Sequence, residues 1–426
     1  MSEEIVSHAC DLSIVIPCLN EAKNLEELLP LIRDFISDLV DYELIVVDGG
    51  SQDNTMQVAE RLGAIAIRQQ GKGYGNALKT GFARASGEYV LTMDGDLSHH
   101  PSLIPNMIRR RQEADVLIAS RFIRQGYSRA PFSRHLMSTI LNKTFQIAVS
   151  MPFEDVSSGF RIYRKCALDS IQIEMENYNV LQEILVKIYV RGYQIKEIPF
   201  HYKPRHKGRS KAKVFKYGFE YFGYLPTAWR LRNNSDSADY DELAFHSRHP
   251  LQKYWQRKRY EIIVDAVGND KKILDIGSGS SMIMEALPHS FSLDIMSNRL
   301  RYKNHDTKRH SVQGSVFSLP FDDGEFDCVI FSQVIEHLPQ DDLILDECVR
   351  VIKPGGKLIF GTPDYGGWQW PMFEWLYSIV NPIGYIDEHI THFTLQSCLE
   401  ELERRGLTIQ YYEYILKAEL IIVATV

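Results

Sequence analysis

The stretch that most constrains the fold of this chain is Tyr89–Pro101, which reads YVLTMDGDLSHHP. It begins with largely apolar, strand-forming residues that predict a buried strand. Asp94 and Asp96 follow, and their spacing directs both carboxylates to the same side of an extended backbone. Gly95 between them leaves room for a ligand near the main chain. Two hard oxygen ligands at a strand end suit a divalent cation that also holds a diphosphate, although an acidic turn would use the same residues.

Two earlier apolar runs also end in polar residues. Residues 13–16 stop at Pro17, and Asn20 and Glu21 then precede an amphipathic helix. A strand, a polar turn and a helix are the opening of a nucleotide-binding α/β unit. The structural alternatives are a helix cap for Asn20 and a first-turn dipole partner for Glu21.

The second run, residues 44–47, ends at Asp48 before two glycines. A carboxylate at this place suits a ribose or base contact, and a tight turn is the alternative. The glycine-rich segment 71–77 allows close approach of the backbone to a ligand, and the helix expected to start near Asn76 offers amide donors to phosphate. Lys72 adds a positive charge beside it.

These segments resemble family 2 glycosyltransferases of the dolichyl-phosphate sugar synthase branch. The matching pieces are SIVIPCLNE, VVDGGSQDNT, GKGYGNALKTGFARASGEYVLTMDGDLSHHP and SSGFRIYRK. The resemblance implies an α/β fold of the GT-A class, a nucleotide-sugar donor, a Mg2+ or Mn2+ ion and inversion at the anomeric carbon. The donor nucleotide would contact Pro17, Asn20, Glu21 and Asp48. The metal ion would contact Asp94, Asp96 and Ser98, where Ser98 replaces a glutamine that is frequent in the branch.

The same resemblance implies an acceptor site further along the chain. It places Arg121 and Arg134 at an acceptor phosphate and Asp155 near the acceptor. A glycan hydroxyl as acceptor would need a base at Asp155. A polyprenyl phosphate is already an anion and needs none. For Arg134 a solvated helix face is the alternative.

The densest basic run is HYKPRHKGRSKAKVFK, residues 201–216. The resemblance implies that Arg205, Ser210 and Lys211 close over the diphosphate, while a solvated loop and a nucleic-acid patch are the alternatives. The aromatic segment that overlaps its end and continues to residue 232 suits a lipid interface or a core helix equally.

Composition limits the partners and the compartment. A net charge of −7 over 426 residues gives no general attraction to nucleic acid, so we expect none as a partner. The six cysteines form no C-x-x-C pair, the acidic N-terminus lacks a signal-peptide pattern, and no apolar run is long enough to cross a bilayer. We therefore expect a cytoplasmic protein, which leaves open a peripheral contact with the cytoplasmic membrane face.

A polar, unpatterned stretch follows the aromatic segment. We predict a linker at 233–249 between one domain at 1–232 and a second at 250–426. The second domain again shows a strand, a glycine loop and a helix, so it is expected to be a further nucleotide-type α/β unit.

Cofactor contacts in this second half are expected where strands end. Asp275 closes one strand and leads into Gly277 and Gly279, and Asp294 ends the next strand about 20 residues later, as in dinucleotide-binding units. Asp294 would hold ribose hydroxyls. Later strand ends add Ser315, Val316 and Gln333.

The second half resembles class I S-adenosylmethionine-dependent methyltransferases of the methyltransferase-11 type. The matching pieces are LDIGSGS, LPFDDGEFDCVIFSQVIEHL and VIKPGGKLIFGTP. The resemblance implies a Rossmann-like fold and S-adenosylmethionine as cofactor. This chain departs from the family pattern at the third glycine position of the loop, which is Ser281. The main alternative to a methyltransferase is a dehydrogenase, which uses a similar loop.

Because the methyl donor is already activated, alignment of the acceptor does most of the work in such an enzyme. A hydroxyl acceptor would also use a base, and the candidates are His337, His389 and His392. The spacing of His389 and His392 also resembles a pair of metal ligands, but no third ligand is evident from the sequence. The alternative is that each of these histidines has only a structural role.

The sequence thus predicts a bifunctional transferase. One half would move a sugar from a nucleotide sugar to a polyprenyl phosphate or glycan acceptor. The other half would methylate, most simply on oxygen, a glycan or lipid-linked intermediate. The alternative is an active first half joined to a nucleotide-binding scaffold or dehydrogenase-like domain.

Overall fold

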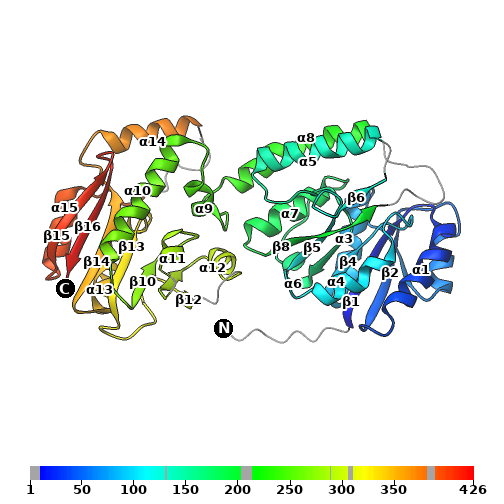
Figure 1. Cartoon of the computed structure of the whole chain (residues 1–426), viewed down its shortest axis with the longest axis horizontal. Coiled ribbons are helices and arrows are strands. Elements are labelled where there is room, and N and C mark those ends of the chain that lie inside the picture. The colour runs from blue at the N-terminus through cyan, green and yellow to red at the C-terminus, as the bar shows by residue number, and fades with distance from the viewer. Residues whose placement is uncertain (1–9, 130–131, 203–213, 288, 306–309, 381–388) are drawn as a thin grey trace. The chain divides into compact units, whose positions relative to one another are not determined.

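The computed structural model describes residues 10–129, 132–202, 214–287, 289–305, 310–380 and 389–426, with side chains except at 132–134, 214–219 and 377–380. The chain divides into two compact units, Met1–Asn233 and Asn234–Val426 (Figure 1). Each unit contains a seven-stranded sheet covered by helices.

The sheet of the first unit has the strand order β3-β2-β1-β4-β7-β5-β8. Neighbours pair in parallel except at β7, which runs antiparallel to both β4 and β5. The strands are β1 (Cys10–Cys18), β2 (Tyr42–Asp48), β3 (Ile65–Arg68), β4 (Gly87–Thr92), β5 (Val116–Ser120), β7 (Arg161–Arg164) and β8 (Ile195–Pro199). A separate two-stranded sheet joins β6 (Tyr127–Ser128) to β9 (His201–Tyr202).

Helices cover both faces of this sheet. They are α1 (Ala22–Ile36), α2 (Thr55–Arg61), α3 (Tyr74–Arg84), η1 (Pro101–Leu103), α4 (Ile104–Arg110), α5 (Phe132–Val149), α6 (Lys165–Asp169), α7 (Val180–Val190) and α8 (Val214–Arg232). The predicted apolar face of α1 is confirmed, since Leu25, Leu28 and Ile32 are fully buried against one face of the sheet. A second apolar cluster fills the other face.

The parallel strands bring three loops to one edge of the sheet. Cys18 at the end of β1 lies opposite Asp48 at the end of β2, and Val15 lies opposite Thr92 at the end of β4. The residues that follow these strands are therefore neighbours, as parallel sheets require at their carboxyl ends.

The sheet of the second unit has the order β12-β11-β10-β13-β14-β16-β15. Its first five strands are parallel, and β16 is antiparallel to both β14 and β15. The strands are β10 (Ile273–Ile276), β11 (Phe291–Asp294), β12 (His310–Gln313), β13 (Phe326–Ser332), β14 (Ile352–Pro363), β15 (Thr408–Ile415) and β16 (Glu419–Thr425). The helices are α9 (Tyr240–Phe245), α10 (Pro250–Val267), α11 (Ile283–Ala286), α12 (Ser297–Lys303), η2 (Ile335–His337), α13 (Asp342–Arg350), α14 (Gln369–Val380) and α15 (Leu395–Arg404).

The glycine-rich segment 353–357 lies inside β14, where the register with β13 shifts between the pairs at Phe326 and Cys328. Gly355 adopts a φ of +79° within this bulge.

One segment of the second unit differs from the expectation. The segment 233–249, expected as a linker, contains α9, and Asp241 of that helix bonds to the loop after β10.

None of the helices in the described ranges combines the length and the apolar content that a membrane span requires.

Candidate active sites

The first two loops at the carboxyl edge of the first unit are tied together by side chains. Asn20 has a φ of +51°, and its Oδ1 accepts a hydrogen bond of 2.6 Å from the backbone N–H of Gln52. Asp48 accepts bonds from the backbone N–H groups of Gly50 and Ser51, both at 3.1 Å. Asn20 therefore braces the loop rather than capping α1, whose cap position belongs to Glu21. Pro17 lies half-buried at the end of β1, and Lys72 is exposed in the loop before α3.

Four carboxylates gather around a single thiol at this edge. Cys18 is buried, and burial raises the pKa of its thiol well above the usual value. The charges of Glu21, Asp48, Asp94 and Asp96 raise that pKa further, which places all four within electrostatic range of Cys18. The local field thus favours a cation.

Two of the three predicted metal ligands, Asp94 and Asp96, occupy different surroundings within this group, and the third, Ser98, is buried beside them. Asp94 is partly exposed, with a side-chain exposure of 37%. The hydroxyl of Tyr74 donates to its Oδ1 at 3.4 Å, and the ring of His99 accepts from its backbone N–H at 2.9 Å. Asp96 is buried, and its Oδ1 accepts from the backbone N–H of Ser98 at 3.0 Å.

This donor set suits a Mg2+ or Mn2+ ion. Its atoms are carboxylate oxygens, the ligands that hard divalent cations prefer. Gly95 holds the two acids close to β1, because a Cβ at this position would lie 2.7 Å from Sγ of Cys18. A side chain there would push the DGD turn out of place.

Arg121 and Asp155 form a bidentate ion pair beside the same edge. Nε and Nη2 of Arg121 each donate to a different carboxylate oxygen of Asp155 at 2.8 Å, and Nη2 also donates to Ser157 at 2.8 Å. Asp155 is fully buried, and the guanidinium keeps its pKa below the usual value despite that burial. The carboxylate is thus a poor base, and it fixes the orientation of Arg121. Asp94 contributes to the raised pKa of Arg121, so the pair lies within range of the acidic group.

In the second unit, hydrogen bonds join the glycine loop to the end of β11. Asp294 accepts bonds from the backbone N–H of Gly279 at 2.8 Å and of Met296 at 2.7 Å. Gly277 has a φ of +69°, and a Cβ there would lie 2.3 Å from the side chain of Val334. Only glycine fits this turn, which brings the loop against the segment after β13.

A hollow opens beside this loop. Its lining includes Asp275, Gly277, Gln333, Arg299 and Asp241. The other predicted cofactor contacts, Gly279, Asp294, Ser315 and Val316, do not line it. Val316 packs into the apolar core next to β12.

Several buried polar atoms around the hollow have no hydrogen-bond partner among the described residues. They are Oδ2 of Asp275, Oγ of Ser278, Nε of Arg299, Oγ of Ser332 and Nε2 of Gln333. Burial raises the pKa of Asp275 to about 8, with further contributions from Asp294 and Asp241. An unsatisfied carboxylate oxygen together with unsatisfied donors in one hollow suits a ligand that carries both a cation and polar acceptors, such as S-adenosylmethionine.

Models of two protein families match the chain. The glycosyl transferase family 2 model matches residues 13–172, and the methyltransferase domain model matches residues 274–360. The chain joins a family 2 glycosyltransferase domain to a methyltransferase domain. Together with the two strand orders, these matches confirm the expected α/β fold class, a GT-A domain followed by a Rossmann-like methyltransferase domain.

Two of the curated relatives show the extent of the likeness. Dolichol-phosphate mannosyltransferase of Pyrococcus furiosus is 34% identical over 228 residues, which cover 51% of this chain and 63% of the relative. Low-salt glycan biosynthesis hexosyltransferase Agl6 of Haloferax volcanii is 27% identical over 219 residues, which cover 50% of this chain and 52% of that protein. The chain therefore spans less than two thirds of the length of either relative.

Solved structures show a weaker likeness. Glucosyl-3-phosphoglycerate synthase from Mycobacterium tuberculosis, in complex with Mn2+, UDP and glucosyl-3-phosphoglycerate, has a TM-score of 0.42 at 21% identity, covering 53% of this chain and 80% of that chain. Its UDP complex has a TM-score of 0.43 at 22% identity, with coverages of 52% and 80%. A likeness of this degree carries no conclusion about ligands.

Four predicted residues of the glycosyltransferase domain lie outside the described part of the chain. They are the side chain of Arg134 and the residues Arg205, Ser210 and Lys211. The donor-side and metal-side residues Asp48, Asp94 and Asp96 are brought together, as described above.

Sequence reasoning missed one residue of the methyltransferase domain. Asp241 of α9 accepts a bond of 2.8 Å from the backbone N–H of Ser280, and its Oδ2 lies 2.3 Å from the place of a Cβ on Gly279. The carboxylate thus covers the glycine loop. No local signal pointed to it, because the surrounding segment is polar without a periodic pattern.

The histidine pair predicted from the sequence is not formed as expected. His389 lies beside Glu336 and His337, and the ring of His392 stacks on that of Tyr365 at 4.0 Å instead. Glu336 was not evident as a neighbour of His389 from the sequence, because it lies on a separate segment that only the fold brings to His389.

Proposed function

We propose that the glycosyltransferase domain transfers a sugar, with inversion, from a nucleotide-diphosphate donor to a polyprenyl phosphate. The observation that carries this proposal is the gathering of Asp48, Asp94 and Asp96 around the end of β1, with Arg121 in electrostatic range. The acids would hold a Mg2+ or Mn2+ ion, which neutralises charge on the diphosphate when it is bound. Arg121, oriented by Asp155, adds a fixed positive charge on the acceptor side.

The state of Asp155 favours a phosphate over a hydroxyl as acceptor. A hydroxyl needs a base, but the carboxylate of Asp155 is engaged by Arg121 and Ser157 and its pKa is lowered. A lipid phosphate arrives as an anion and needs no such base. The relative named dolichol-phosphate mannosyltransferase supports the same choice.

The experiment is a transfer assay over a panel of sugar nucleotides, with a polyprenyl phosphate in detergent as one acceptor and a free glycan as the other. We expect metal-dependent transfer to the lipid phosphate from one donor of the panel. Transfer to the glycan alone would instead support a hydroxyl acceptor and a different base.

An apolar surface on the glycosyltransferase domain would hold such a lipid at the membrane. Leu136, Ile140 and Ile147 are exposed on one face of α5, and Phe222 and Trp229 are exposed on one face of α8. The two helices lie side by side (Figure 1), joined by a bond from the Tyr221 hydroxyl to the carbonyl of Leu141. We propose that this surface contacts the lipid interface.

Vesicle flotation tests this surface. Replacing Ile140 and Ile147 together by Asp should lower the vesicle-bound fraction by at least about tenfold, because each isoleucine contributes more than ~1 kcal/mol when buried in lipid. Leu39→Asp is the matched control, since Leu39 is also exposed but lies away from α5 and α8. Equal flotation of the double variant and the control would contradict the proposal.

We further propose that the methyltransferase domain uses S-adenosylmethionine to methylate an oxygen of a glycan or lipid-linked intermediate. Asp294 would hold the ribose hydroxyls, while Asp275 and Asp241 face the cationic part of the cofactor. When bound, the cofactor supplies an activated methyl group, so the domain has mainly to align the acceptor.

Affinity for S-adenosylmethionine is expected to rise about tenfold per pH unit between pH 6 and 8. A cation beside Asp275 binds better when that carboxylate is ionised, and the pKa of Asp275 is raised to about 8. Calorimetry should therefore detect proton release on binding at pH 7, a release that Asp275→Asn abolishes. Asp265→Asn, on the exposed side of α10, is the control. An affinity that is equal at pH 6 and 8 would contradict this role of Asp275.

The same raised pKa has a consequence for stability. Without cofactor, the folded domain keeps a proton on Asp275 that the unfolded chain releases near pH 4. The folded state therefore binds more protons in this range, and its stability falls as the pH rises from about 4 to about 8.

A further inference from the structure

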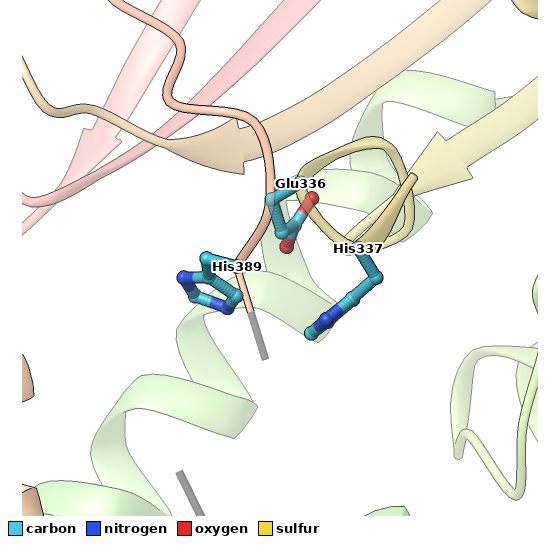
Figure 2. A group of neighbouring side chains, drawn as sticks. All are labelled: Glu336, His337 and His389. Carbon is cyan, nitrogen blue, oxygen red and sulfur yellow. The ribbon is translucent and has the colours of Figure 1, made fainter. Parts of the chain in front are cut away.

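Three side chains with metal-binding chemistry converge in the methyltransferase domain. Glu336, His337 and His389 each offer one ligand atom, and these atoms lie within 4.8 Å of one another. Figure 2 shows the three side chains pointing toward a common space from two separate segments. A carboxylate and two imidazoles are the ligand set of many sites for zinc and related divalent metals.

Backbone hydrogen bonds hold these segments together. Glu336 and His337 belong to η2, just after β13, and His389 enters from the segment before α15. The carbonyl of Glu336 accepts bonds from the N–H groups of Ile390 at 2.8 Å and Thr391 at 3.1 Å. The ligand atoms therefore meet through the fold, without depending on an attraction between the side chains themselves.

The carboxylate of Glu336 lacks the partners that a buried acid normally has. It is 1% exposed, and neither oxygen has a hydrogen-bond partner of normal geometry among the described residues, although the backbone N–H of Glu336 and the Thr362 hydroxyl interact favourably with it. Burying a carboxylate with so few partners is costly, and its place next to two imidazoles suits a bound cation.

His389 is also held in the orientation of a ligand. Its Nδ1 lies 2.8 Å from the hydroxyl of Tyr365, and that hydroxyl donates to Glu374 at 3.0 Å. Oε1 of Glu374 also lies 3.5 Å from the same Nδ1. Contacts of this kind to the second ring nitrogen fix the orientation of a histidine ligand in metal sites.

We propose that Glu336, His337 and His389 bind a divalent transition-metal ion of the zinc class, with coordination positions left open for an oxygen of the methyl acceptor. The place suits this role, since Gln333 of the same loop lines the cofactor hollow. The ion would lower the pKa of an acceptor hydroxyl, whose proton passes to water. The alkoxide forms the new O–CH3 bond as the S–CH3 bond breaks, and the electron pair stays on sulfur. This chemical role rests on the proposed methyl transfer, whereas the metal site does not.

The test uses Co2+ as a coloured probe on the full chain. Every chain in this test carries Asp94→Asn, which weakens Co2+ binding at the proposed site of the glycosyltransferase domain. Co2+ bound there by oxygen ligands would in any case absorb visible light only weakly. We expect visible absorption typical of low-coordinate Co2+ with nitrogen ligands, and Zn2+ should displace it. His389→Ala and, at the exposed ligand, His337→Ala should abolish the signal. His249→Ala is the matched control, because His249 is exposed at the start of α10 and lies outside the cluster.

Tyr365→Phe adds a second readout. It removes the bond that orients His389, so the dissociation constant for Co2+ should rise about 10- to 100-fold with the spectrum preserved. Absence of Co2+ absorption in a folded chain, or full absorption in both His389→Ala and His337→Ala, would overturn the site. If Co2+ binds as expected but the chain fails to bind S-adenosylmethionine, the site stands and the proposed methyl transfer fails.

Discussion

Asp94→Asn is expected to slow metal-dependent sugar transfer by about 10³-fold, which corresponds to a loss of ~4 kcal/mol of transition-state stabilisation. The substitution removes the charge of a partly exposed carboxylate while keeping its shape, so the chain should fold. Loss of one anionic ligand weakens the hold on the cation that would neutralise the diphosphate. The measurement is the initial rate of transfer at increasing Mn2+, where a high concentration should restore part of the activity.

The control for this variant is Asp38→Asn, an exposed acid at the end of α1 that is remote from the acidic group. Its transfer rate should equal that of the wild type. S-adenosylmethionine affinity should be unchanged in both variants. A transfer rate for Asp94→Asn within threefold of the wild type, together with insensitivity to a chelator, would rule out the metal site.

Removal of Asp155 is expected to have the largest effect on stability. In Asp155→Ala the guanidinium of Arg121, whose side chain is only 18% exposed, loses its bidentate partner. Breaking a buried ion pair on one side costs about 3–5 kcal/mol, which lowers the melting temperature of a domain of this size by roughly 10 °C. Ser157→Ala removes a single bond to the same guanidinium and should cost only about 1 kcal/mol.

A double variant separates stability from activity. In Arg121→Met with Asp155→Leu both charges are gone, so much of the lost stability should return. Transfer should remain as low as in Arg121→Met alone, because the positive charge near the acceptor is missing. Recovery of transfer in the double variant would show that the pair serves the fold only.

The pH dependence of stability gives an independent check on this pair. The pKa of Asp155 is lowered in the folded state, so the pair stabilises the domain above the ordinary carboxyl pKa. This contribution is lost as the pH falls through the depressed value. Acid unfolding of Asp155→Asn should therefore depend less steeply on pH than that of the wild type.

Local patterns in the sequence determined the elements of both domains. The period of apolar residues located α1 and its buried face, and the apolar run 326–332 has the same bounds as β13. The polar residues at strand ends located the acidic group, because residues that follow parallel strands must meet at one edge. Asp94 and Asp96 could be assigned together since only one residue separates them.

Only the tertiary structure decided how distant side chains pair. Arg121 and Asp155 are 34 residues apart, and β7 enters the sheet between β4 and β5 to bring them together. Asp241 meets the glycine loop across 39 residues, and His389 reaches Glu336 through backbone bonds between two loops. Such contacts follow from packing and register across the whole domain, and neither periodicity nor spacing encodes them locally. That is why the sequence could place each carboxylate at a strand end, while the roles of Asp155, Asp241 and Glu336 emerged only from the side chains that the fold sets against them.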